Sequence, residues 1–263
     1  MSEAKGLYLT TRYTESLRVL QSLSQQDASV LELTGQNHFM LGDFKQAADT
    51  FEALLKISPQ SSKAYLGLGR SIGRIAETAN PFRQPGLAVK ARKNFEKAVE
   101  LGPNNVEAMN VLLEYYLRAP GFLGGGTDKA EALAARLKSI DPVEYHSAQA
   151  RVAEYRNDLA RAESNLRRAA ELAPKRVGRL LDLASFLARH GRISESDDTF
   201  RQAETLSPAD PELLFTRASV LIETKRDQRQ ARELLQRYLA SALTPDHPPR
   251  AEAEKLLRKV SGD

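Results

Sequence analysis

The apolar residues of this chain recur three or four positions apart in a series of segments that each end in a proline. Such spacing predicts amphipathic helices, and proline ends a helix because it lacks an N–H and disfavours helical geometry in the residue before it. The segments are FEALLKISP (51–59), FEKAVELGP (95–103), LKSIDP (137–142), LRRAAELAP (166–174) and FRQAETLSP (200–208). Their prolines lie 44, 39, 32 and 34 residues apart, so the pattern predicts a series of similar helical units.

Small residues recur at two fixed places in each unit, where they let neighbouring helices approach closely. They are Ala47, Ala91, Ala130, Ala162, Ser196 and Ala231 and, further upstream, Gly35, Gly69, Ala150, Ala184 and Ala218. Pairs of large residues are expected to fill the seam between the helices: Phe51 with Ile57, Phe95 with Leu101, and Phe200 with Leu206. The turns are expected at GDF (42–44), GRI (191–193) and RNDL (156–159).

This pattern resembles the tetratricopeptide repeat, a helix–turn–helix unit of about 34 residues, over nearly the whole chain. The resemblance implies an all-α fold, a right-handed α–α superhelical solenoid of about six units with terminal capping helices. Residues 1–263 would form a single solenoid. Its expected parts are a leading helix or cap in 1–27, repeats at 28–61, 62–105, 106–142, 143–176, 177–210 and 211–244, and a cap helix in 245–263.

Two adjacent units are longer than the rest and carry inserts, which are expected between their first and second helices and near each other. One insert is AETANPFRQPGLAVKA (76–91), and the other opens APGFLGGGTDKAEALA (119–134). The three glycines do not form a phosphate-binding loop of the Walker type, because no strand precedes them and Lys129 does not directly follow the last glycine. Thr127 is expected to cap the next helix, with an anion contact at the glycine amides as the alternative.

Residues 90–142 look more specifically like a subgroup of bacterial tetratricopeptide proteins, which carry an APG–GGG–KA insert after an FEKAVELDPNNV segment. Many members of that subgroup are exported, and the resemblance implies no catalytic residue. Gly102 departs from the pattern, because Asp is usual there. The two inserts remain a candidate site at one edge of the solenoid, formed by Phe82, Arg83, Phe122, Gly124, Gly125, Gly126 and Lys129.

Composition excludes several classes of site. The 263 residues include no cysteine, so disulfides, thiolate metal sites and a cysteine nucleophile are excluded. The histidines do not cluster at metal-ligand spacing, and no GxSxG elbow occurs, so we expect no enzyme, no metal and no cofactor. No apolar run approaches the length of a membrane span. The sequence as written predicts a cytoplasmic protein, or a periplasmic or secreted one if an export signal precedes it.

The first helices of the units are expected to line a groove that binds a peptide or protein segment. Its candidate residues are Phe39, Arg70, Arg74, Asn110, Arg118, Arg151, Tyr155 and Arg189. The arginines favour a partner with an acidic side chain or a free C-terminal carboxylate. In the alternative, they pair with glutamates of adjacent helices. The predicted function is a non-catalytic scaffold. Nucleic-acid binding, suggested by NLRRAAELAPKRVGR (165–179) and a formal charge of +4, and self-assembly are the alternatives.

Overall fold

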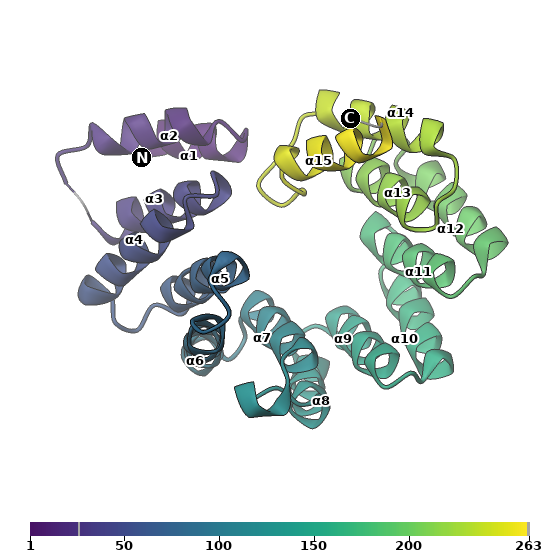
Figure 1. The fold of residues 1–263 in the computed structure, drawn as a ribbon, viewed down its shortest axis with the longest axis horizontal. Helices are drawn as coiled ribbons and strands as arrows, with labels where there is room; N and C mark the ends of the chain where they lie inside the picture. The colour runs from purple at the N-terminus through teal and green to yellow at the C-terminus, as the bar shows by residue number, and fades with distance from the viewer. Residues whose placement is uncertain (26, 262–263) are drawn as a thin grey trace. The chain divides into compact units, whose positions relative to one another are not determined.

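The structure, a computed structural model, describes residues 1–25 and 27–261. All regular structure in this part of the chain is helical, as the sequence predicts, with fifteen α-helices and two short 3₁₀ helices (Figure 1). The chain divides into two compact units, which we call unit 1 (Met1–Asn157) and unit 2 (Asp158–Asp263).

Unit 1 is a series of helices in which each packs against the next along the chain. Alternate helices also touch, since α3 contacts α5 and α7 contacts α9. The helices are α1 (Ser2–Leu9), α2 (Tyr13–Gln21), α3 (Ala28–Met40), α4 (Phe44–Ile57), α5 (Ser62–Thr78), α6 (Gln84–Leu101), α7 (Val106–Arg118), η1 (Gly121–Leu123), α8 (Thr127–Arg136), η2 (Leu137–Ser139) and α9 (Pro142–Tyr155).

Unit 2 continues with α10 (Leu159–Leu172), α11 (Val177–Arg189), α12 (Ile193–Leu206), α13 (Pro211–Glu223), α14 (Gln228–Ala240) and α15 (Arg250–Ser261). Here α11 contacts both α12 and α13. Helix α15 packs against α14 and buries Ala253 and Val260 in the same apolar cluster as Leu235 and Tyr238. The last helix thereby covers apolar surface that α14 would otherwise expose.

Capping side chains and prolines explain where many of the helices begin and end. Aspartates at the N-caps of α3, α9, α10, α13 and α14 accept hydrogen bonds from backbone N–H groups of the first turn, which satisfies donors that a helix start leaves open. Four of the five marker prolines follow the capping residue of α4, α6, α10 or α12. Pro142 instead occupies the first position of α9, where its missing N–H costs nothing.

The predicted tight turns are present. Gly42 and Gly191 have φ values of +83° and +77°, and Asn157 has a φ of +59°. Glycine adopts this left-handed region without a steric penalty, and asparagine is among the residues that tolerate it best.

The phenylalanines of the predicted seam are buried, whereas two of their partners are not. Phe51, Phe95 and Phe200 are 3%, 6% and 1% exposed, but Ile57 and Leu206 are 54% and 48% exposed. The prediction is wrong for these two residues, which stand at the last positions of α4 and α12.

The first insert differs from the expected loop. Most of its residues extend α5 to Thr78 and start α6 at Gln84, so that only residues 79–83 remain as a turn. Leu, Ala, Val and Lys in the stretch after Gly86 have moderate to good helix propensity, which explains why the insert is largely helical.

Candidate functional site

A hollow with a volume of about 560 Å³ opens on one face of unit 1, over α5, α7 and α9. Residues three, four or seven apart share a face of a helix, and the lining follows this spacing on α7 and α9. The lining residues are Arg70, Val106, Glu107, Asn110, Val111, Glu114, Asp141, Glu144 and Arg151.

Polar side chains form a row across the three helices of this hollow. Arg70 Nη1 lies 2.6 Å from Glu107 Oε1. Arg151 Nη2 donates to Asn110 Oδ1 over 2.5 Å, and Asn110 Nδ2 donates to Glu144 Oε2 over 3.1 Å. Each step therefore joins a helix to the next helix of the same face.

Of the predicted groove residues, the structure brings Arg70, Asn110 and Arg151 together in this hollow. Arg74 pairs with Glu77 on its own helix over 2.7 Å, and Arg118 pairs with Glu114. These two pairs lie within single helices, whereas Arg70–Glu107 is a pair between helices of the kind that the alternative expects.

The other predicted groove residues do not line the hollow. Phe39 packs edge-to-face on Phe44, with ring centroids 5.4 Å apart. Tyr155 is 56% exposed at the end of α9, and Arg189 lies on α11 in unit 2.

Two carboxylates that bond this row of side chains were missed at the sequence level. Glu107 and Glu144 stand in the first turns of α7 and α9, where acidic residues are common because they favour the positive end of the helix. Glu144 is seven residues from Arg151 and so shares its face of α9. That spacing is the signal that could have identified it.

The three glycines of the second insert are held by backbone hydrogen bonds of their own chain. The amide of Gly124 donates to Gly121 O over 2.8 Å, that of Gly125 to Pro120 O over 3.3 Å, and that of Gly126 to Tyr116 O over 2.8 Å. An anion site at a helix start needs N–H groups that point at the ligand. The amides of these glycines instead close the turn onto the end of α7.

Contacts of the surrounding side chains also hold this insert in place. Lys129 Nζ donates to Gly124 O over 2.9 Å and lies 5.6 Å from the centre of the Tyr116 ring. The Tyr116 hydroxyl donates to Glu96 Oε1 over 2.9 Å, and burial together with this carboxylate raises the pKa of Tyr116. The N-cap of α8 is Gly126 rather than the predicted Thr127, which makes no capping hydrogen bond.

Comparison with known families and structures identifies the fold family. The model of the tetratricopeptide repeat family matches residues 10–72, 147–211 and 181–248, more than half of the chain. The chain belongs to the tetratricopeptide repeat family. The stretch between the matched segments, residues 73–146, contains both inserts. No curated protein matches the chain in sequence.

Several solved structures resemble this one in fold. A thermophilic member of the family from Thermus thermophilus is 22% identical, with a TM-score of 0.59 over 71% of this chain and 96% of that chain. Another from Parabacteroides merdae is 11% identical, with a TM-score of 0.65 over 100% of this chain and 97% of that one. The Cut9–Hcn1 hetero-tetramer of the APC/C is 16% identical, with a TM-score of 0.53 over 98% of this chain and 48% of the other.

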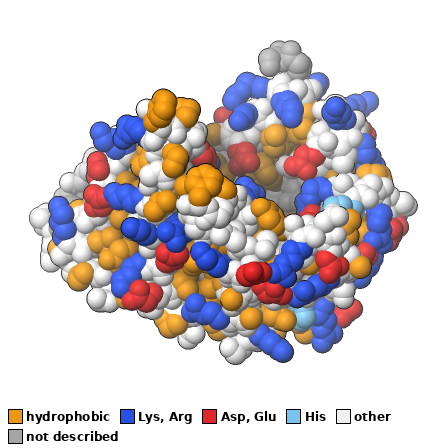
Figure 2. Space-filling model, turned by 60° about the horizontal axis from the view of Figure 1, so that its bottom comes forward, with side chains coloured by type: hydrophobic (Ala, Val, Ile, Leu, Met, Phe, Trp, Pro, Cys, Tyr) orange, Lys and Arg blue, Asp and Glu red, His pale blue; other side chains and the backbone are white. Residues whose placement is uncertain are grey.

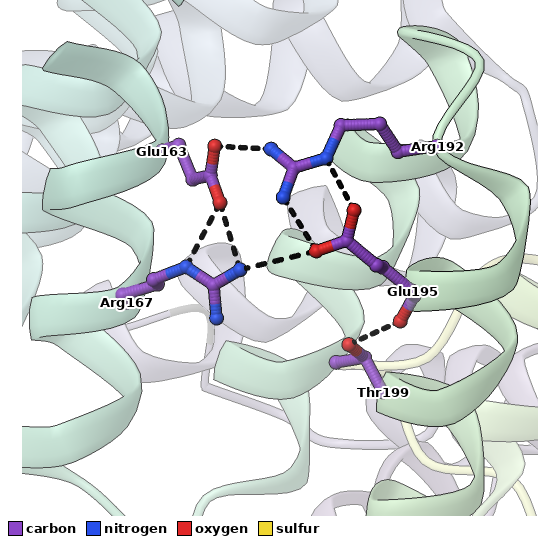
Figure 3. A network of polar contacts seen from close by, with 5 residues as sticks. All are labelled: Glu163, Arg167, Arg192, Glu195 and Thr199. Atoms are coloured by element: carbon purple, nitrogen blue, oxygen red, sulfur yellow. Dashed lines mark hydrogen bonds and ion pairs between the residues drawn. The ribbon is translucent and has the colours of Figure 1, made fainter. Parts of the chain in front are cut away.

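Unit 2 of this tetratricopeptide repeat protein carries an ionic network between α10 and the start of α12 (Figure 3). Arg192 bonds both Glu163 and Glu195, and its Nε lies 2.7 Å from Glu195 Oε1. Arg167 bonds Glu163 with its Nε at 2.9 Å and approaches Glu195 at 3.7 Å. Two arginines and two glutamates thus alternate around a closed ring.

An open hollow of about 500 Å³ lies beside this network, between α10, α11 and α12. Arg167 belongs to both, and the other lining residues are mostly apolar or uncharged: Ala170, Glu171, Pro174, Leu180, Leu183, Gln202, Thr205 and Leu206. The network therefore joins α10 to the start of α12 beside this hollow.

The network predicts a loss of stability in acid. Hydrogen bonds from Arg192 lower the pKa of both Glu163 and Glu195, so these carboxylates stabilise the fold above the usual glutamate pKa of about 4.3. The contribution is lost as the pH falls through their lowered pKa values. We expect the melting temperature to drop less between neutral pH and about pH 3 in Glu163→Gln/Glu195→Gln than in the wild type.

Glu171→Gln is the matched control, because Glu171 pairs with Arg168 on the exposed side of the same helix. Its melting temperature should follow the wild-type pH profile. A double variant with an unchanged acid response would show that the ring does not contribute.

The described part of the chain contains no group of three or more His, Cys, Asp or Glu side chains that could hold a metal ion. Among the same residues, no helix combines the length and the apolar character that crossing a membrane requires.

Proposed function

We propose that this tetratricopeptide repeat protein is a non-catalytic scaffold that binds a segment of another protein in the hollow over α5, α7 and α9. Tetratricopeptide repeat proteins bind other proteins or peptides, and they are typically non-enzymatic scaffolds. The observation that carries the proposal is the row from Arg70 to Arg151, which presents hydrogen-bonding groups of three helices to one open hollow.

The charged side chains that line the hollow determine which kind of segment can bind there. The hollow has four carboxylates and two guanidinium groups, so it repels a segment with many acidic side chains. A single carboxylate at a C-terminus can approach the two arginines, because a guanidinium has five N–H donors and Arg70 uses only one nitrogen on Glu107. Val106 and Val111 offer apolar contact to the preceding side chains. We therefore propose a free C-terminal carboxylate as the recognised group.

We also propose that units 1 and 2 belong to one series of repeats with the boundaries given above. The family match to residues 147–211, which runs across the division between the units, supports this. Membership of the bacterial subgroup with the APG–GGG–KA insert is a further proposal, supported by residues 90–142.

Nucleic-acid binding finds less support. In the basic stretch 165–179, Arg167, Arg168 and Arg179 each pair with an acidic residue of the chain. Figure 2 shows Lys and Arg interspersed with Asp and Glu over the visible face. A nucleic-acid site usually concentrates its positive charge, so we retain the protein partner.

The test uses short random peptides displayed with free C-termini and selected on the purified chain. We expect the Arg70→Gln/Arg151→Gln variant to bind the selected peptides about tenfold or more weakly, since charge-assisted hydrogen bonds contribute about 1.5–3 kcal/mol. Amidation of the peptide C-terminus should have a similar effect. Fluorescence anisotropy gives the affinities.

The matched control is Arg201→Gln/Arg229→Gln, because both arginines are exposed and pair within their own helices in unit 2. It should bind as the wild type does. If amidated peptides bind as well as free ones, the terminal carboxylate is not recognised. Concentration-dependent mass in sedimentation would instead indicate self-assembly.

A further inference from the structure

The inserts leave two aromatic side chains in solvent. Phe82 is 97% exposed and Phe122 is 82% exposed, the highest values among the large hydrophobic side chains of the described residues. A buried phenylalanine removes roughly 150–250 Å² from water, and neither of these rings contributes that area to the fold. Large exposed aromatic side chains at one place mark interaction surfaces.

Both inserts lie along α6. Phe82 stands two residues before the start of α6 at Gln84. The 3₁₀ helix η1, which contains Phe122, packs against α6, and a Cβ at Gly124 would meet the guanidinium of Arg92 at 2.7 Å. We call residues 79–93 and 118–123 the insert edge. Figure 2 shows a face on which hydrophobic side chains are exposed among charged side chains of both signs.

The insert edge is positively charged without exception. Its charged residues are Arg83, Lys90, Arg92, Lys93 and Arg118, and it contains no Asp or Glu. Lys90 pairs with Glu52 and Arg92 with Glu96, each over 3.0 Å, and Arg118 pairs with Glu114. Within the described part of the chain, the Arg83 guanidinium and the Lys93 ammonium have no hydrogen-bond or ion-pair partner. The insert edge thus contains two exposed cations without a partner.

We infer that the insert edge is a second docking surface, which binds an acidic segment of a partner protein through its charge and takes apolar side chains of that segment against Phe82 and Phe122. The hollow over α5, α7 and α9 is rich in carboxylates, whereas the insert edge has none. A segment with many acidic side chains is therefore repelled by the hollow and attracted by the insert edge.

The arrangement of the charges fits a linear partner. Arg83 is the N-cap of α6, and Lys93 lies ten residues further along the helix. At a rise of 1.5 Å per residue, the two positions are about 15 Å apart along the helix axis. An extended segment covers that distance with about five residues. A segment of that length laid along α6 therefore spans the distance between the two cations, and repeat proteins of this family bind protein segments.

The experiment selects short random peptides on the full chain and measures their affinities by fluorescence anisotropy. Enriched peptides should combine several Asp or Glu residues with at least one large apolar residue. We expect Phe82→Ser/Phe122→Ser and Arg83→Glu/Lys93→Glu each to weaken their binding by about tenfold or more. Both variants should melt as the wild type does, because the altered side chains are exposed.

Lys45→Glu/Lys56→Glu is the matched control, since it reverses two exposed lysines of α4 in the same unit. It should bind the acidic peptides almost as the wild type does. Arg70→Gln/Arg151→Gln should leave the binding of acidic peptides to the insert edge unchanged. A failed proposal for the hollow can therefore be distinguished from a failed proposal for the insert edge.

Three results would overturn the inference. Enrichment of only basic or neutral peptides would exclude the proposed charge complementarity. Acidic peptides that bind the Phe82→Ser/Phe122→Ser variant at full affinity would exclude the rings as anchors. Binding of the chain to phosphatidylserine vesicles in a sedimentation assay, lost in the Phe82→Ser/Phe122→Ser variant, would assign the surface to anionic lipid.

Discussion

Replacing Phe51 with alanine is expected to lower the free energy of unfolding by about 3–5 kcal/mol. Phe51 is 3% exposed on α4. A Cβ at Gly35 would lie 2.8 Å from its ring, and one at Gly67 2.4 Å from it. The ring therefore fills space that these two glycines leave open on α3 and α5. Neither glycine has a side chain that could move into the cavity, so the site cannot collapse easily.

Phe82→Ala is the matched control for Phe51→Ala, because it removes the same ring from a site that is 97% exposed. Its effect should stay within about 0.5 kcal/mol. Urea unfolding followed by circular dichroism gives both values from the midpoint and the slope. Similar losses in the two variants would show that the α3–α5 seam is not a rigid part of the core.

The repeat pattern predicts the helices well because each unit depends on few, local features. Helix periodicity, a small residue opposite a phenylalanine and a proline after the helix all act within one or two neighbouring helices. Gly69 with Phe95 illustrates this, since a Cβ at Gly69 would lie 2.6 Å from the ring. Such a contact follows from sequence spacing alone.

The hollow could be predicted only in part. The positions of Arg70, Asn110 and Arg151 follow from the face of each first helix. Their partners Glu107 and Glu144 depend on how far one helix is displaced along the next, across 34 to 37 residues of chain. That displacement is set by packing between helices, and no local pattern encodes it.

The contacts of the glycine insert could likewise be predicted only in part. The sequence excludes a Walker loop, but the hydrogen bonds of the three amides depend on a return of the chain onto α7. This return makes Gly126 the N-cap of α8 and brings Gly125 against Ala119. The backbone path of the insert, and not its composition, decides which atoms meet.

Replacing Gly125 with alanine is expected to lower the free energy of unfolding by about 2–3 kcal/mol. A Cβ at this position would lie 1.7 Å from Ala119 O and 2.6 Å from Ala119 C. These are backbone atoms, so no side chain can rotate away to make room. The insert would have to open, and the hydrogen bond from the Gly126 amide to Tyr116 O would weaken with it.

Gly121→Ala is the control for Gly125→Ala, because a Cβ at Gly121 would meet no atom within 4 Å. We expect Gly125→Ala to lower the melting temperature by roughly 4–12 °C, at about 2–4 °C per kcal/mol, and Gly121→Ala to change it little. Amide hydrogen exchange at Gly126 should become faster only in Gly125→Ala, because only that variant separates the insert from α7. Equal stability and equal exchange in the two variants would show that the insert does not pack closely on Ala119.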